Sequence, residues 1–128
     1  MAVVSDPMTE EQRAVQAAII ARQNDLFRTA FPLGGFAEVP GRVVCTPGVV
    51  EKGPMFLTLL QLTVAAFDTF TEENDPWGDH SFGVVEVSGI RVLWKIDLYD
   101  QSYEFGAEEP ANPERTRRVL TMLLPSEY

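Results

Sequence analysis

The chain has little cysteine and no long hydrophobic run. Cys45 is its single cysteine among 128 residues, which excludes an intrachain disulfide and fits a reducing compartment. The most apolar stretch, residues 55–67, is uncharged but too short to span a bilayer, and it favours a buried helix. The first residues, MAVVSDPMTEEQ, lack the basic stretch and apolar core of a signal peptide, so we expect a cytoplasmic protein.

Basic residues are scarce in one third of the chain. Residues 68–109 contain eleven acidic side chains and only Arg91 and Lys95 as bases, so this segment alone carries the net charge of −9. Such a field repels a polyanion, which argues against direct nucleic-acid binding and favours basic proteins, cations or simple solubility. The same segment holds the only histidine, both tryptophans and all tyrosines but the last. A functional surface is therefore expected here.

Two helices are predicted in the first half of the chain. Thr9 and Gln12 match a capping box, and a helix then runs to about Phe31 with an apolar stripe through Val15, Ile19, Leu26 and Ala30. Ile20, Phe27 and Phe31 lie beside that stripe. A second helix begins at Gly53-Pro54 and runs to about Phe70. Apolar residues nearly encircle this second helix, so most of its surface should be buried.

Short β-branched or alternating runs predict about four strands. They cover residues 42–46, 82–87 and 90–98, with Ser88-Gly89 as a two-residue hairpin turn. Residues 115–124 fit a helix or a strand, and we favour a strand from about Arg117. The order α-β-α-β-β-β predicts an α+β fold, a single two-layer domain with a mostly antiparallel sheet and two helices on one face. The domain comprises residues 1–128, and residues 1–8 are expected to be flexible.

Three motifs in the second half carry a resemblance. They read NDPxGxHxFG (residues 74–83), WKIDxYD (94–100) and RVLT (118–121). Together they resemble an uncharacterised family, a domain of unknown function, of small alphaproteobacterial proteins associated with plasmids and phages. The resemblance covers residues 68–128 and brings no catalytic residues. It implies a mobile-element setting, where small acidic proteins often disarm host defence.

The acidic segment has two interpretations. Its clustered carboxylates could imitate a nucleic-acid backbone and occupy the basic groove of a nucleic-acid-binding protein, or they could form a solvated face that aids solubility. Asp75, before Pro76, could simply cap a turn. Exposed aromatic residues among the acids are typical of a protein-binding surface, and the equally favoured alternative is that these loop aromatics fold back onto the edge of the sheet. The predicted partner-binding residues are Glu72, Glu73, Asp75, Trp77, Asp79, Asp100, Tyr103, Glu104, Glu108 and Glu109, with Tyr99 and Phe105 as further aromatic candidates.

His80 also has more than one interpretation. With Asp75, Asp79, Asp97 and Asp100 nearby in the sequence, it could form a metal site or a general base, or it could contact a partner. No HExxH, CxxC or EF-hand spacing supports this, and a histidine in such a loop more often bonds backbone groups of its own turn. We therefore favour a structural role and predict no catalytic residue, metal or cofactor. Cys45 is expected to be an inert core residue.

Several charged residues are expected to pair with one another. Lys95 and Asp97 lie on one face of their strand, where they could pair with each other or with a neighbouring strand, opposite Trp94, which we place in the core. A small basic cluster, Arg115, Arg117 and Arg118, is expected to pair with Glu108 and Glu109 or with the acidic face of a second copy. The sequence leaves the oligomeric state open.

The leading functional prediction is a non-enzymatic, acidic protein-binding module. Its most specific form is an inhibitor of a host defence complex that binds nucleic acid, as in anti-CRISPR or anti-restriction proteins. The alternatives are a metal-dependent enzyme centred on His80 and nearby aspartates, and an accessory partner of plasmid replication or partition proteins.

Overall fold

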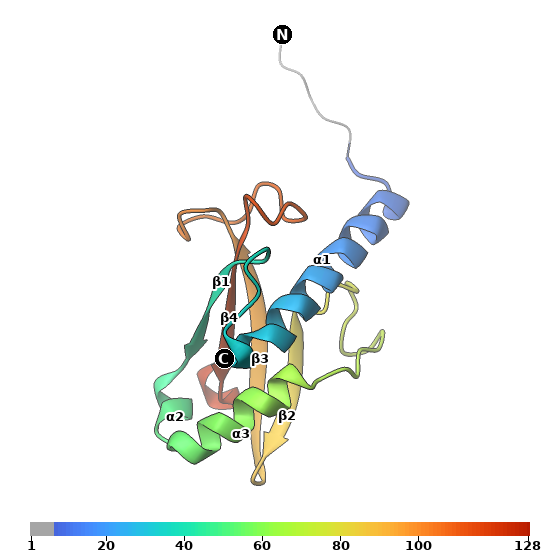
Figure 1. Cartoon of the computed structure of the whole chain (residues 1–128). Coiled ribbons are helices and arrows are strands. Elements are labelled where there is room, and N and C mark those ends of the chain that lie inside the picture. The colour runs from blue at the N-terminus through green and yellow to red at the C-terminus, as the bar shows by residue number, and fades with distance from the viewer. Residues whose placement is uncertain (1–6) are drawn as a thin grey trace.

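Two helices cover one face of a four-stranded sheet (Figure 1). The computed structural model describes residues 7–128, so most of the flexible start expected for residues 1–8 lies outside the described residues. The elements are α1 (Glu10–Ala30), η1 (Phe31–Leu33), β1 (Gly41–Cys45), α2 (Pro47–Val50), α3 (Pro54–Ala65), β2 (Phe82–Val87), β3 (Ile90–Tyr99), β4 (Arg117–Leu123) and η2 (Pro125–Glu127). The predicted α+β class is confirmed.

The first helix begins where the capping box predicts. The Thr9 hydroxyl accepts from the Gln12 N–H at 3.1 Å, and the Gln12 side chain accepts from the Thr9 N–H at 2.8 Å. The side of α1 that is buried differs, however, from the apolar stripe that the sequence predicted. The buried side of α1 runs through Ile20, Asn24 and Phe27. Val15 and Ile19 are exposed, because the first half of α1 projects beyond the sheet (Figure 1).

The sheet has the strand order β1-β4-β3-β2. Both pairs that involve β3 are antiparallel, and β1 pairs with β4 in parallel, so the sheet is mostly antiparallel as expected. The hairpin between β2 and β3 turns at Ser88 and Gly89, whose φ angles of 51° and 77° are those of a type I′ turn. The segment that fitted a helix or a strand is β4.

The core lies between the sheet and the two helices. Trp94, Val92, Leu120 and Met122 point from β3 and β4 toward the helices and are fully buried. The alternation predicted for β3 is confirmed, with Trp94 in the core. Within residues 7–128, the opposite face of the sheet carries no α-helix (Figure 1), and the C-terminal Tyr128 packs edge-on against Phe82 there. No helix in residues 7–128 is long and apolar enough to cross a membrane.

The second long helix differs from the prediction. It ends at Ala65 rather than near Phe70, and the short helix α2 precedes it. Only one side of α3 is buried, through Phe56, Leu60 and Val64. The expectation of a mostly buried helix was wrong because the helical layer is one helix thick. Its outer apolar side chains remain exposed: Met55 to 79%, Leu59 to 45% and Leu62 to 56%.

Candidate protein-binding site

Three consecutive residues of α1 hold the two loops that contain most of the acidic residues of the 68–109 segment. These loops, residues 71–81 and 100–116, are called the acidic loops below. The Gln23 amide donates to the Ala111 carbonyl at 2.9 Å, and the Asn24 amide donates to the Asp79 carbonyl at 2.8 Å. The Asp25 carboxylate lies 2.9 Å from His80 Nδ1. One turn of α1 therefore fixes both loops, which flank it on either side (Figure 1).

Arg118 completes this attachment from β4. Its side chain is fully buried, and it donates from Nε to Asn24 Oδ1 at 2.7 Å and from Nη2 to Gln23 Oε1 at 2.9 Å. Burial lowers the pKa of Arg118 to about 10. The predicted pairing of Arg118 with Glu108 or Glu109 was wrong, because this guanidinium points inward to two amide oxygens. Because this buried cation depends on the neutral amide oxygens of Asn24 and Gln23, replacing either residue would leave part of the guanidinium without an acceptor.

The 71–81 loop is ordered by bonds within itself. Asn74 Oδ1 accepts from the Thr71 N–H at 2.8 Å, and Asp75 Oδ1 accepts from the His80 N–H at 3.2 Å. Asp75 therefore caps its turn, and its side chain is only 7% exposed. The tip of the loop points to solvent, where Trp77 is 81% exposed.

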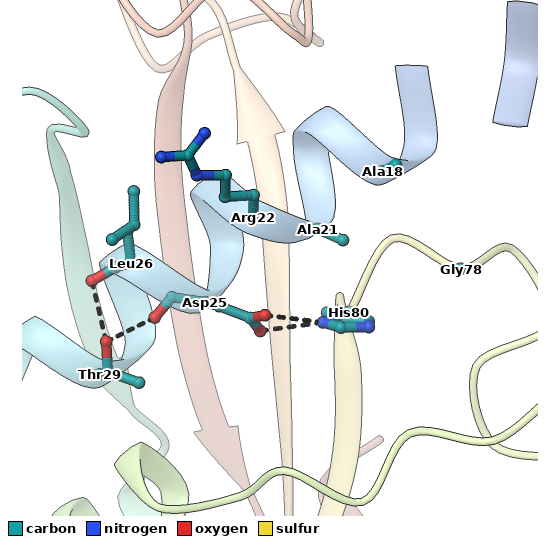
Figure 2. A pocket seen from close by; sticks show the side chains of 8 residues that line it. All are labelled: Ala18, Ala21, Arg22, Asp25, Leu26, Thr29, Gly78 and His80. Atoms are coloured by element: carbon teal, nitrogen blue, oxygen red, sulfur yellow. Dashed lines mark hydrogen bonds and ion pairs between the residues drawn. The ribbon is translucent and has the colours of Figure 1, made fainter. Parts of the chain in front are cut away.

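His80 fastens this loop to the helices. Its ring stacks on Phe70 with centroids 3.8 Å apart, and Nδ1 faces the Asp25 carboxylate (Figure 2). Nε2 lies 3.6 Å from Asp75 Oδ2. We predicted that the imidazole bonds backbone groups of its own turn. Those predicted partners were wrong. Both ring nitrogens face carboxylates, and one of these belongs to a helix 55 residues away.

A recess of about 490 Å³ lies beside this pair, between α1 and the 71–81 loop (Figure 2). Asp25, Arg22 and His80 supply its polar lining, and Ala18 and Ala21 supply part of its apolar lining. The Asp25 carboxylate also accepts from Arg28 at 3.0 Å. The carboxylate is thus shared between a guanidinium and an imidazole, which makes it a structural connection between α1 and the loop.

The four residues of the metal-enzyme alternative do not assemble. Asp97 points to the uncovered face of the sheet, where it accepts from Lys95 at 2.6 Å, as predicted for this pair. His80 lies on the helix-covered side with Phe70, which packs edge-on against Trp94. Within residues 7–128, no group of three or more His, Cys, Asp or Glu side chains has a geometry suited to a metal ion. Cys45 is partly buried, and burial raises the pKa of its thiol.

The 100–116 loop is built around Asp100. This carboxylate accepts from the Ser102 hydroxyl at 2.7 Å and from the Glu104 N–H at 3.3 Å, and these bonds lower its pKa. Tyr103 is half-buried, with the Arg42 guanidinium 3.8 Å above its ring, so it is not the exposed contact residue that we predicted. Phe105 is 68% exposed.

Eight of the acidic residues in the two acidic loops fall into two groups. Asp75, Asp79, Asp100 and Glu109 have partners within the chain; Glu109 pairs with Arg115 at 3.4 Å, as predicted. Asp100, Glu108, Glu109 and Arg115 share a polar recess of about 300 Å³. Among residues 7–128, the exposed carboxylates Glu72, Glu73, Glu104 and Glu108 form no ion pair and no side-chain hydrogen bond.

The sequence interpretation missed Gln23, Asn24 and Asp25. One signal was available, because Asn24 falls four residues after Ile20 and three before Phe27, which places an amide on the buried side of α1. A buried polar side chain requires a hydrogen-bond partner. The sequence around Asn24 does not indicate which residue that partner is.

The family comparison covers most of this site. A family model described as "Protein of unknown function (DUF3768)" matches residues 45–127, which include both acidic loops and exclude α1. Neither the curated proteins nor the solved structures contain a match to the chain.

Proposed function

The chain belongs to this family of unknown function, and we propose that it is a non-enzymatic module whose acidic loops bind a basic surface of another protein. In its most specific form, the partner is a nucleic-acid-binding host defence complex, such as a CRISPR effector or a restriction enzyme. The acidic loops would occupy its basic groove in place of DNA or RNA. A protein of plasmid replication or partition would be bound in the same manner, with a different target.

The attachment of both acidic loops to one turn of α1 carries this proposal. Gln23, Asn24 and Asp25 hold the loops, so their tips have a fixed position relative to each other. A surface that is ordered before binding loses little conformational entropy when it binds. Ordering two loops costs conformational entropy, and a solvated face that only improved solubility would not need ordered loops.

Each tip also combines a free charge with an exposed aromatic ring. Trp77 is accompanied by Glu72 and Glu73, and Phe105 is accompanied by Glu104. Aromatic residues dominate the binding energy of many protein interfaces, whereas peripheral charges mainly raise the association rate and select the partner. Exposed rings oppose solubility, so this combination favours a binding role over a purely solvated face.

The test requires a defined target. Tagged full-length protein is used to capture proteins from a bacterial lysate that has been cleared of nucleic acid. Each captured protein is identified, purified and titrated against the chain with and without duplex DNA. We expect a nucleic-acid-binding protein for which DNA and the chain compete, with an affinity that falls as salt rises.

A charge-matched pair of variants locates the surface. Glu72→Lys with Glu108→Lys reverses one free charge on each acidic loop. Glu38→Lys with Glu51→Lys makes the same change in net charge at exposed positions outside them. We expect the loop variant to bind about ten-fold more weakly or worse, about 1.4 kcal/mol, and the control to bind as wild type does. Equal loss in both variants would show that only net charge matters, and binding unchanged in the loop variant would refute the proposal.

A further inference from the structure

The outer side of α3 is an apolar surface without a partner in the described chain. Met55, Leu59 and Leu62 recur at positions i, i+4 and i+7, so they lie along one side of the helix, and all three are exposed. Residues 53–67 contain no charged side chain. A soluble helix normally shows charged residues on its solvent side, so this side of α3 is suited to contact with another surface.

This apolar surface opens toward one edge of the sheet. A groove of about 490 Å³ runs between α3 and β2, and Leu59, Leu62, Ala66, Val85 and Glu86 are among the residues that line it. The strand β2 is at the end of the order β1-β4-β3-β2, so no strand formed by residues 7–128 neighbours its other side. The exposed helix side and the free strand edge therefore border the same groove.

Apart from the charge of Glu86, the edge of β2 lacks the usual protection against pairing. Its register with β3 is continuous from Phe82 to Val87, without a bulge or a proline. Ser81 accepts from the Ile96 N–H, and backbone bonds alternate along an antiparallel pair. Phe82, Val84 and Glu86 therefore direct their N–H and C=O groups to the free edge. The other edge strand, β1, is flanked by Pro40 and Pro47.

We propose that two copies of this chain associate through β2 and α3 about a two-fold axis near Val84. With Val84 opposite its own copy, Phe82 lies opposite Glu86 of the second copy, and all three outward-facing residues join a single antiparallel ladder. The two sheets become one continuous sheet. The two α3 helices then lie side by side over the junction, and the Leu59 and Leu62 side chains of each copy cover those of the other.

A second copy fits this surface better than an unrelated partner does. The edge is self-complementary about Val84, which is the property an isologous interface needs. Copies of a chain with a net charge of −9 repel each other unless the contact holds few acids; α3 is free of charge, and the acids that line the groove are Asp68 and Glu86. Glu86 is the one acid of β2, and Arg91 lies directly opposite it in the hairpin.

Oligomeric mass tests this proposal. Sedimentation and light scattering of the full-length chain are compared over a wide range of concentrations, and we expect a particle of twice the 14.3 kDa chain mass. Leu62→Lys places a charge on the contact side of α3, and Val84→Lys places two like charges at the axis. Leu33→Lys is the matched control, because Leu33 is 90% exposed in η1.

We expect both interface variants to dimerise at least about ten-fold more weakly, and the control to remain dimeric. Circular dichroism verifies that the variants are folded; Val84 is already 43% exposed, so its replacement leaves the core unchanged. A wild-type monomer at all concentrations would overturn the proposal. A dimer unaffected by both substitutions, or a particle larger than a dimer, would also overturn it.

Discussion

Replacement of Asn24 by alanine should destabilise the protein strongly, although Asn24 lies on a helix where alanine is favoured. The Asn24 side chain is fully buried and has two partners: its amide N–H₂ donates to the Asp79 carbonyl, and its Oδ1 accepts from Arg118 Nε. A hydrogen bond to a charged group contributes about 1.5–3 kcal/mol and a neutral one about 1 kcal/mol. Asn24→Ala also leaves part of a buried guanidinium without an acceptor.

We therefore expect Asn24→Ala to lower the free energy of unfolding by about 3–4 kcal/mol. That is a large share of the roughly 5–15 kcal/mol typical of a small domain. The assay is urea unfolding followed by the fluorescence of the buried Trp94. Trp77→Phe is used as the background, so that the exposed indole does not contribute.

Asn24→Asp is the matched variant. It keeps an acceptor for Arg118 and adds a charge of opposite sign, but it turns the amide donor into a carboxylate oxygen that faces the Asp79 carbonyl, so its loss of stability should be below that of Asn24→Ala without vanishing. A cost below about 1 kcal/mol for Asn24→Ala would refute the reasoning, since it would mean that the guanidinium finds water or another acceptor at once. Equal costs for the two variants would refute the role assigned to the Arg118 bond.

Three further predictions concern other parts of the fold. Gly83→Ala should cost about 1–3 kcal/mol in urea unfolding, because a Cβ at Gly83 would overlap the Trp94 indole. The Glu127 pKa is lowered chiefly by its bond to the Thr46 hydroxyl. This carboxylate therefore stabilises the fold at pH values above its ordinary pKa of 4.5, and the stabilisation is lost as the pH falls through the lowered pKa. Glu127→Gln should flatten the dependence of stability on pH in that acid range. Burial raises the pKa of Cys45, so at pH 8 its thiol should react with a disulfide reagent more slowly in the folded protein than in urea.

Each of these predictions has a contradicting result. Wild-type stability in Gly83→Ala would mean that the indole moves without cost. An unchanged acid dependence in Glu127→Gln would assign the acid sensitivity to other carboxylates. Equal thiol reactivity in the folded and unfolded chain would show that Cys45 is as accessible in the fold as in urea.

Local patterns predicted those elements whose causes are close together in the chain. The capping box of Thr9 and Gln12 joins residues three apart, and it begins α1. The Ser88-Gly89 turn lies between two alternating strands and forms the predicted hairpin. The burial of α3 was mispredicted because apolar residues around a helix indicate how much surface could be buried, whereas burial itself depends on how many layers pack against the helix.

The sequence by itself determined the net charge, its concentration in residues 68–109, and the helices and strands that short-range signals specify. Charge is a sum over residues, and caps and turns act over a few positions. Only the tertiary structure decided that Gln23 and Asn24 hold the two acidic loops, because those bonds join residues 88 and 55 positions apart. It also decided which carboxylates are free, since a carboxylate's partners depend on the chain segments that pack beside it.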